Sequence, residues 1–269
     1  MKLMNTPRAV DIDITNRCNL RCAYCYHFTS AGDVEGDLPK DEWLQFFEEL
    51  NKCNVMNVTL SGGEPFFRKD LKDLLQGLVN NRMRYSILSN GTLITDELAS
   101  FVAATRRCNA VQISIDGSSS PIHDSFRGNG NFDRAIRGVR TLQDHGVGVN
   151  VRVTIHKNNV RDLENIAKLL LEELGLPGFS TNSAMYTGLC RNNTEIVQLS
   201  PQERAIAMES LYKLNKKYGG RINATAGPLA ESNFWAKMET ARIEGKARPG
   251  GGHLTGCNCV MSKLAVRAD

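Results

Sequence analysis

The chain has 269 residues, of which 41% are hydrophobic and 23% are charged, and 33 Lys and Arg against 29 Asp and Glu give a formal net charge of +4. This composition is typical of a globular chain with a large core and excludes a disordered, collagenous or coiled-coil protein. The positive charge is weak and the sequence contains no run of five basic residues, so neither nucleic acid nor a membrane surface is the expected partner.

The absence of targeting signals in the sequence and its cysteine content both bear on the cellular compartment of the protein. No segment approaches the ~18 apolar residues of a membrane span, and the N-terminus has no apolar stretch like that of a signal peptide. We therefore expect a cytoplasmic protein. In a reducing compartment the eight cysteines are not a disulfide set, so they are core residues, metal ligands or nucleophiles.

Strand and helix patterns alternate along the chain. Alternating or short apolar runs predict strands at Ala9–Thr15, Val55–Leu60, Tyr85–Leu88, Val111–Ile115, Val147–Ile155 and Phe179–Tyr186. Apolar residues at helical spacing predict helices at Leu38–Cys53, Asp70–Asn81, Thr95–Thr105, Phe132–His145, Val160–Leu174 and Pro201–Tyr218. Six such units indicate an α/β fold with a parallel sheet and right-handed crossovers, which the pattern alone does not assign to a doubly wound sheet or to a barrel.

The composition changes after about residue 219, where glycine and small residues become frequent. We expect one domain over residues 1–219 and a second region, 220–269, that begins as a linker. The final stretch, Lys263–Asp269, alternates like the beginning of a strand that has no partner. Because a strand without a partner is not a stable ending, we expect the natural protein to continue beyond this chain.

Three cysteines follow the first predicted strand. Cys18, Cys22 and Cys25 fall within eight residues, at the strand end where ligand sites form in parallel α/β folds. Three thiolates in one loop can hold three irons of a four-iron cluster and leave the fourth iron open to a substrate or cofactor. Two other interpretations remain. On a helix the three thiols would share one buried face, and structural zinc would need a distant fourth ligand such as Cys53.

The segment CNLRCAYC, residues 18–25, resembles the C-x3-C-x-aromatic-C motif of the radical S-adenosylmethionine (SAM) enzymes, with Tyr24 at the aromatic position. Gly62, Gly63 and Glu64, after the second strand, are similar to the GGE motif of that family. There, exposed backbone and a carboxylate hold the amino group of the SAM methionine. Glycines allow a ligand to approach the backbone closely, and Glu64 offers an acceptor to an ammonium group.

Later strand ends supply the other SAM-binding residues that this resemblance implies. They are Ser89, Asn90, Ser114, Asp116, Arg152 and Thr154. Asn-Gly and Asp-Gly are also ordinary turn sequences, so the segments 89–91 and 114–117 have a purely structural interpretation as well. The resemblance covers about residues 8–220.

The resemblance implies a (β/α)6 partial TIM barrel of the radical SAM type, open at one side for the substrate. It also implies that a reduced [4Fe-4S] cluster gives one electron to SAM, and that the resulting 5′-deoxyadenosyl radical abstracts a hydrogen atom from the substrate. An electron donor such as flavodoxin or ferredoxin would then be a partner. The alternative of another class is a metal- or cluster-binding protein without enzymatic activity.

The C-terminal part resembles the entry to a SPASM or twitch extension, which binds auxiliary iron–sulfur clusters. Cys257 and Cys259 precede the alternating stretch Met261–Asp269, and an auxiliary cluster here would have these two cysteines and Cys190 as ligands. Two cysteines in a Gly-rich stretch are otherwise free thiols. Members with this extension often modify ribosomally made peptides. The expected substrate is therefore a peptide or protein side chain that is oxidised or cross-linked, with a separate peptide-recognition protein as a partner. A small molecule of cofactor or natural-product biosynthesis is the alternative.

Overall fold

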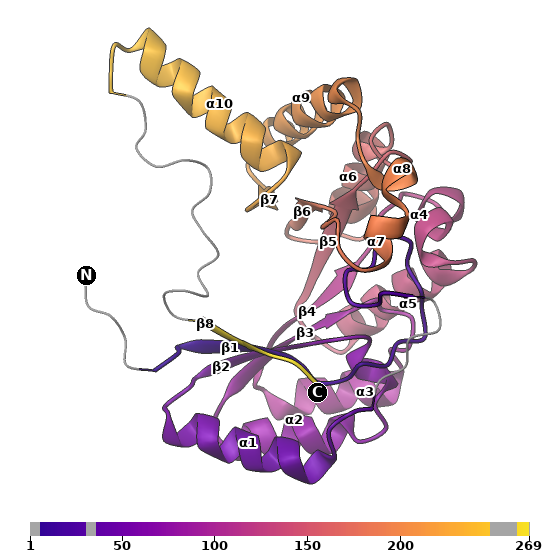
Figure 1. The fold of residues 1–269 in the computed structure, drawn as a ribbon, viewed down its shortest axis with the longest axis vertical. Coiled ribbons are helices and arrows are strands. Elements are labelled where there is room, and N and C mark those ends of the chain that lie inside the picture. The colour runs from indigo at the N-terminus through magenta and orange to yellow at the C-terminus, as the bar shows by residue number, and fades with distance from the viewer. Residues whose placement is uncertain (1–5, 31–35, 248–262, 269) are drawn as a thin grey trace.

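The computed structural model describes residues 6–30, 36–247 and 263–268. Within these residues, eight parallel strands form one sheet in the order β7-β6-β5-β4-β3-β2-β1-β8 (Figure 1). The strands are β1 (Ala9–Asp13), β2 (Asn57–Ser61), β3 (Arg84–Ser89), β4 (Cys108–Ser114), β5 (Val149–Ile155), β6 (Phe179–Ser183), β7 (Ile222–Ala224) and β8 (Lys263–Val266). In the described part of the chain β7 and β8 do not pair with each other, so the barrel is open between them.

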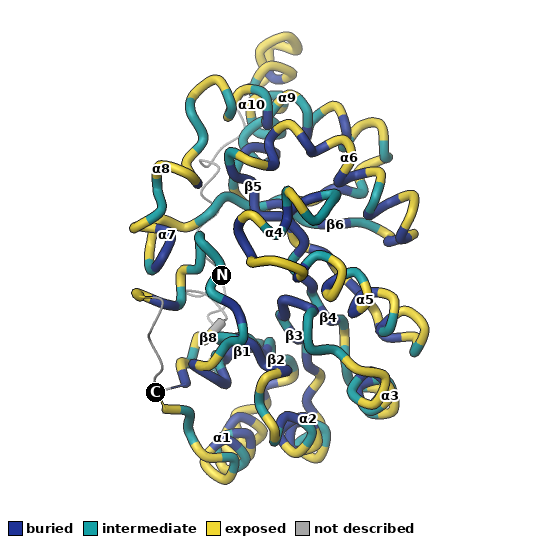
Figure 2. The backbone as a smooth tube through the Cα atoms, turned by 90° about the vertical axis from the view of Figure 1, so that its right-hand side faces the viewer, coloured by how far each residue is buried: buried dark blue, intermediate teal, exposed yellow. Residues whose placement is uncertain are grey.

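Helices α1, α2, α3, α5 and α6 return the chain between successive strands along the outer side of the sheet (Figures 1 and 2). The helices are α1 (Lys40–Lys52), α2 (Leu71–Asn80), α3 (Asp96–Thr105), α4 (Ser120–Arg127), α5 (Asn131–Asp144), α6 (Leu163–Lys168), α7 (Leu189–Asn192), α8 (Thr194–Val197), α9 (Pro201–Lys217) and α10 (Pro228–Ile243). Two shorter turns are the 3-10 helix η1 (Pro65–Phe67) and the π-helix η2 (Leu169–Glu173), which continues α6. The predicted partial barrel is thus confirmed.

The two faces of the sheet differ in chemistry. Along β1, Val10 and Ile12 are fully buried in the apolar core together with Trp43 of α1. Asp11 and Asp13, which alternate with them, are half-buried and line a cavity on the inner face. Successive side chains of a strand point to opposite faces. The outer face therefore supplies the apolar burial that stabilises the fold, and the inner face carries polar residues.

All six predicted strands and all six predicted helices are present with small shifts in their bounds. The expectation that the last strand has no partner is wrong: β8 pairs with β1, with Leu264 opposite Val10. A strand this short is stable here because it extends the edge of an existing sheet. Both β7 and β8 belong to the same sheet as the six predicted strands, while the division of the chain at residue 219 stays a prediction.

Helices α4, α7, α8 and α10 were not predicted. The long helix α10 packs against α9 and β7, in a region expected to be a linker. Its pattern is hard to recognise because only Pro228, Leu229 and Ala241 are buried along its length. Within the described residues no helix is both long and apolar enough to cross a membrane.

Candidate active site

A cavity of about 370 Å³, here called the cysteine cavity, lies on the inner face of the sheet at the carboxyl ends of the strands. It contains most of the predicted site. The predicted residues that line it are Cys18, Cys22, Tyr24, Cys25, Gly62, Gly63, Ser89, Asn90, Ser114, Arg152 and Thr154. Glu64 and Asp116 lie outside the lining. The structure thus brings together residues from five strand ends, and their binding roles stay predictions.

The three cysteines lie in an irregular segment after β1, so the interpretation that they share one face of a helix is wrong. All three are half-buried and line the cavity. Within the described residues no three His, Cys, Asp or Glu side chains gather closely enough to hold a single metal ion. Cys53 is exposed at the end of α1 and does not line the cavity. Cys53, the fourth ligand considered for a structural zinc site, therefore does not share the cavity with the three cysteines.

The surroundings of the thiols fit an iron–sulfur cluster. Burial raises the pKa of Cys18 to about 12 and that of Cys22 to about 11, so without a metal both thiols stay protonated at neutral pH. Three N–H groups nevertheless point at these sulfurs. The Leu20 amide lies 3.4 Å and the Asn90 side-chain amide 3.8 Å from Cys18 Sγ, and the Arg127 guanidinium lies 3.9 Å from Cys22 Sγ. Such donors stabilise metal-bound thiolates.

The Gly62–Gly63 turn packs directly on the cysteine loop. The amide of Gly63 donates to the Thr15 carbonyl oxygen, and the amide of Glu64 donates to that of Arg17, both at 2.8 Å. A Cβ atom at Gly62 would collide with the Thr15 carbonyl oxygen, and one at Gly63 with the Arg17 carbonyl oxygen. Gly62 also has a φ of +122°, which side chains with a Cβ rarely adopt. The glycines therefore fix this turn against the cysteine loop and leave its backbone facing the cavity.

Glu64 lies behind the cavity and joins the ends of β2 and β3. It is 1% exposed, and its carboxylate accepts from the Ser89 hydroxyl at 2.8 Å, the Asn90 amide at 2.7 Å and the Phe66 amide at 3.1 Å. Burial raises its pKa to about 7, although these hydrogen bonds act in the opposite direction. The structure therefore gives Glu64 a positioning role, and its contact with an ammonium group stays a prediction.

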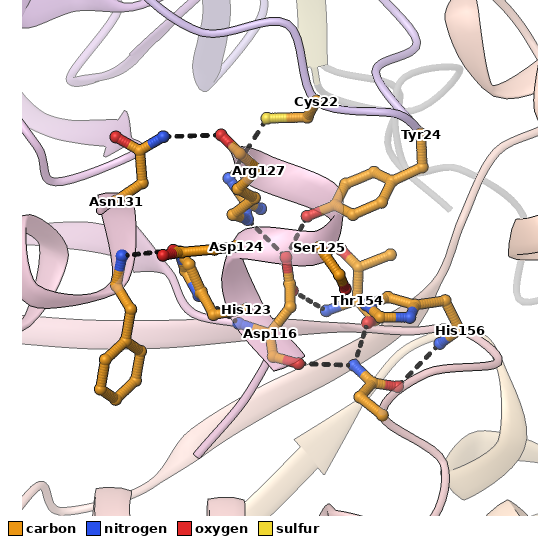
Figure 3. A network of polar contacts seen from close by, with 12 residues as sticks. Cys22, Tyr24, Asp116, His123, Asp124, Ser125, Arg127, Asn131, Thr154 and His156 are labelled. Atoms are coloured by element: carbon orange, nitrogen blue, oxygen red, sulfur yellow. Dashed lines mark hydrogen bonds and ion pairs between the residues drawn. The ribbon is translucent and has the colours of Figure 1, made fainter. Parts of the chain in front are cut away.

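Asp116 is likewise buried behind the cavity, in the polar network shown in Figure 3. Its carboxylate forms an ion pair with Arg127, accepts from the Tyr24 hydroxyl, and accepts from the Thr154 amide at 2.8 Å. Burial alone would raise the pKa of Asp116, but the charge of Arg127 is the leading influence that holds it below the usual range. Asp116 thus orients Tyr24 and Arg127 at the edge of the cavity instead of lining it.

Arg127 is the residue that the sequence analysis missed. It ends α4, is 7% exposed, lines the cysteine cavity and reaches Cys22. A signal for α4 was present in the sequence, because Ser119 and Pro121 form a typical helix start. A helix that starts there can include Arg127, but the sequence does not predict that the Arg127 side chain points towards the cysteines.

The segment with α7 and α8 covers the cysteine loop from the other side. The amide of Cys190 donates to the Cys25 carbonyl oxygen at 3.3 Å, and the side chain of Asn193 donates to the Ala23 carbonyl oxygen at 3.0 Å. Cys190 is fully buried in a small cluster with Phe126 and Val197 and does not line the cavity. It therefore packs as an apolar residue at this position. Cys257 and Cys259, the other predicted auxiliary-cluster ligands, lie outside the described residues.

A second cavity of about 590 Å³, here called the polar cavity, adjoins the first one. Residues shared by the two linings are Tyr26, Ser61, Leu88, Gln112 and Arg152. Asp11 and Asp13 of β1 line only the polar cavity. Burial lowers the pKa of the Arg152 guanidinium, and within the described residues it makes no ion pair with a carboxylate. The inner face of the sheet therefore carries charges of both signs beside the cysteine cavity.

Comparisons with known proteins agree with this arrangement. The family model described as Radical SAM superfamily matches residues 12–170. Fe-coproporphyrin III synthase of Methanosarcina barkeri is 34% identical over 209 residues, which cover 76% of this chain and 52% of that protein. AdoMet-dependent heme synthase of the same organism is 27% identical over 227 residues, 84% of this chain and 64% of that protein. Mycofactocin maturase MftC of Mycobacterium tuberculosis is 33% identical over 167 residues, 62% of this chain and 42% of that protein.

Solved structures share the fold at lower identity. Streptococcus suis SuiB bound to precursor peptide SuiA superposes with a TM-score of 0.75 and 16% identity, over 99% of this chain and 58% of that chain. The protein anSMEcpe with bound AdoMet superposes with a TM-score of 0.72 and 18% identity, over 97% of this chain and 72% of that chain. The chain spans between 42% and 64% of the length of the three curated relatives named above.

Proposed function

This chain belongs to the radical SAM superfamily, and from that premise we propose that Cys18, Cys22 and Cys25 hold a [4Fe-4S] cluster with SAM beside it in the cysteine cavity. When bound, the cluster would supply the electron that breaks the S–C5′ bond of SAM, giving methionine and the 5′-deoxyadenosyl radical, which would abstract a hydrogen atom from the substrate. The observation that carries this proposal is the shared cavity, in which three cysteines meet the Gly62–Gly63 turn.

The residues of the chain would bind and orient SAM by ordinary polar contacts. Gly62 and Gly63 line the cavity, and backbone carbonyl oxygens of this turn would suit an ammonium group. The Arg152 guanidinium, which faces the same cavity, suits a carboxylate. Ser114 and Thr154 add hydroxyl groups at the neighbouring strand ends. Tyr24, held by Asp116, would fix the far side of the cysteine loop.

A peptide or protein side chain is the proposed substrate, with its oxidation or cross-linking as the outcome. In the described residues the sheet is open between β7 and β8, and the polar cavity continues from the cysteine cavity. An extended chain can enter such a groove from the side, and the polar lining can bind its amide groups. The name of MftC as a maturase and the peptide-bound structure of SuiB support the same class of substrate.

A small molecule of cofactor biosynthesis is the second candidate. It is favoured by the heme synthase and the Fe-coproporphyrin III synthase, which match 84% and 76% of this chain against 62% for MftC. In the polar cavity, Arg152 and Arg267 would suit the carboxylates of a tetrapyrrole, whereas Asp11 and Asp13 would repel them.

Further parts of the proposal concern residues and partners outside the described structure. Cys257 and Cys259 would hold an auxiliary cluster, in keeping with a SPASM or twitch extension that begins after residue 219. A flavodoxin or ferredoxin would supply the electron. A separate protein would recognise the peptide.

Anaerobic reconstitution with iron and sulfide, followed by dithionite and SAM, tests the proposal. We expect about four irons per chain, or about seven to eight if an auxiliary cluster also forms, and we expect 5′-deoxyadenosine as a product. Cys22→Ala should lose the cluster and the product, whereas Cys53→Ala, which changes an exposed cysteine, should retain both. A loaded cluster without 5′-deoxyadenosine would instead identify a cluster-binding protein. Zinc in place of iron would contradict the proposal.

A further inference from the structure

Asp13 ends β1 and brings a half-buried carboxylate to the polar cavity. Its Oδ1 accepts a hydrogen bond from the Ser61 hydroxyl at 2.6 Å. Among the residues that the structure describes, its Oδ2 accepts no hydrogen bond and makes no ion pair. Because a carboxylate can accept several hydrogen bonds, one fixed oxygen orients the group and the other is available to a ligand.

The carboxylate lies where the two cavities meet. Ser61, its hydrogen-bond partner, lines both cavities, and so does Tyr26, which directly follows the last cysteine of the loop. A ligand group on Asp13 would therefore lie beside the passage that leads to the cysteine cavity.

Charges of both signs line the polar cavity around Asp13. Asp11, two residues earlier on the same face of β1, adds a second carboxylate to the lining. Arg152 lies on β5, and β2, β3 and β4 separate that strand from β1 in the sheet. Arg267 directly follows β8, which pairs with β1, and it also lines the cavity. The cavity is therefore lined by carboxylates of β1 and by the guanidinium groups of Arg152 and Arg267, of which Arg152 lies farthest from Asp13 in the sheet.

We propose that Asp13 determines substrate specificity by binding a basic side chain, Lys or Arg, of the peptide, beside the residue that reacts. This inference rests on the proposed function, because it assumes that a peptide occupies the polar cavity. An ammonium or guanidinium group would complete the coordination of Oδ2 with a charge-assisted hydrogen bond. A substrate carboxylate at the same place would be repelled by Asp13 and Asp11.

The net charge of the chain would act against a preference for basic peptides. The formal charge of +4 favours acidic peptides over basic ones at long range. A preference for Lys over Glu therefore cannot come from the overall field of the protein. It requires a carboxylate at the binding position.

An array of immobilised hexapeptides tests the inference. The peptides are arranged in pairs that differ only by Lys or Glu at one central position, and the cluster-loaded full chain is applied anaerobically with SAM. A charge-assisted hydrogen bond corresponds to roughly tenfold stronger binding or more, so the wild-type signal should favour Lys by about that factor. Asp13→Asn keeps an oxygen for Ser61 but removes the charge, and should abolish the preference. Asp133→Asn, at an exposed position of α5, should keep it.

Three results would overturn the inference. The first is an equal Lys preference in the wild type and in Asp13→Asn, and the second is no Lys preference in the wild type. The third is tight binding of coproporphyrin III, measured by its Soret band, with the same affinity in both proteins. Formation of 5′-deoxyadenosine is measured in the same preparations, so that the two proposals are judged separately. A Lys preference without 5′-deoxyadenosine would contradict the proposed function alone. Formation of 5′-deoxyadenosine without a Lys preference would contradict the role of Asp13 alone.

Discussion

Glu64 is a carboxylate with almost no exposure to water, and its three hydrogen bonds all come from the ends of β2 and β3 and the turn between them. A carboxylate can only accept, and each of its three partners donates. Replacing one oxygen with an NH2 group places a donor against a donor in a buried position. The arrangement therefore depends on the carboxylate itself, and the isosteric amide is the most informative replacement.

Above pH 7, where the Glu64 side chain is a carboxylate, we expect Glu64→Gln to lower the free energy of unfolding by about 1–3 kcal/mol, the cost of leaving a buried polar group unsatisfied. Urea denaturation of the cluster-free protein, followed by circular dichroism, measures this change. Glu48→Gln, at an exposed position of α1, is the matched control and should leave stability within about 0.5 kcal/mol. Equal stability of the two variants would show that Glu64 does not hold the strand ends together.

The pH dependence of stability offers an independent check on the burial of Glu64. Its pKa is raised from 4.5 to about 7, so the folded protein keeps this proton at pH values where the unfolded chain has lost it. The contribution of this group to stability is fully present below the unfolded pKa and is lost as the pH rises through the folded pKa. From about pH 4.5 to 7 the stability of the wild type should therefore fall relative to Glu64→Gln. A constant difference over this range would contradict the raised pKa.

The sequence predicted which residues meet at the site better than it predicted what each of them touches. Spacing placed the three cysteines in one loop, and the resemblance to the GGE motif predicted that the Gly62–Gly63 turn lies at the same site, where the structure has it in the cavity lining. Asp116 was predicted in the same way from a strand end, but it faces Arg127, eleven residues later. A strand-end position does not specify which side of the loop a carboxylate faces. That depends on a helix packed from another part of the chain.

At the scale of elements, the α7–α8 segment is the support of the cysteine loop. Gly188, directly before α7, has a φ of +57°, and a Cβ atom there would lie 2.5–2.7 Å from the carbonyl oxygens of Cys25, Tyr26 and Phe28. Carbonyl oxygens of the backbone cannot move apart as a flexible side chain can. A side chain at position 188 would therefore push the loop that carries the third cysteine.

We expect Gly188→Ala to reduce cluster loading strongly while most of the barrel stays folded. Iron per chain and the visible absorbance of the reconstituted protein measure loading, and circular dichroism measures folding. Gly219→Ala is the matched control, because Gly219 has a similar φ of +62° but its Cβ would meet nothing within 4 Å. Both variants place an alanine at a positive φ, and Gly188→Ala adds the strain of a ψ of −140° to the contact with the loop, so circular dichroism has to show that the variant is folded before its loading is compared. Equal loading of the two variants would show that α7 does not position the cysteine loop.

Elements with strong amphipathic patterns were the predictable part of the fold. The crossover helices bury apolar stripes against the sheet, and their spacing was legible in the sequence, as in Leu71, Leu74, Leu75 and Leu78 of α2. The short helices α7 and α8 bury only a few residues each and lie over a loop instead of the sheet. Their formation depends on tertiary contacts, which no local pattern contains. These helices are also the ones that support the site.

At the scale of the whole molecule, stability and function are divided between the two faces of one sheet. The outer face is closed by helices, whereas the inner face carries two adjoining cavities with side chains from distant parts of the chain. The strand ends on this side are joined by hydrogen bonds between neighbours, as between Glu64 and Ser89 and between Asp116 and Thr154. A ligand that touches several of them would add a further connection between these loops.

SAM binding should protect these loops together. In hydrogen exchange of the reconstituted protein, we expect slower exchange at residues 14–30, 61–65, 89–92 and 114–118 when SAM is present, because the proposed ligand contacts all four strand ends. At about 100 times its dissociation constant, a ligand stabilises the native state by roughly 2.7 kcal/mol, which is enough to slow opening of these loops about a hundredfold. The helix at 228–243 lines neither cavity and should show no change. Protection confined to 14–30 would mean that SAM meets only the cysteine loop, and that the other strand ends serve another ligand.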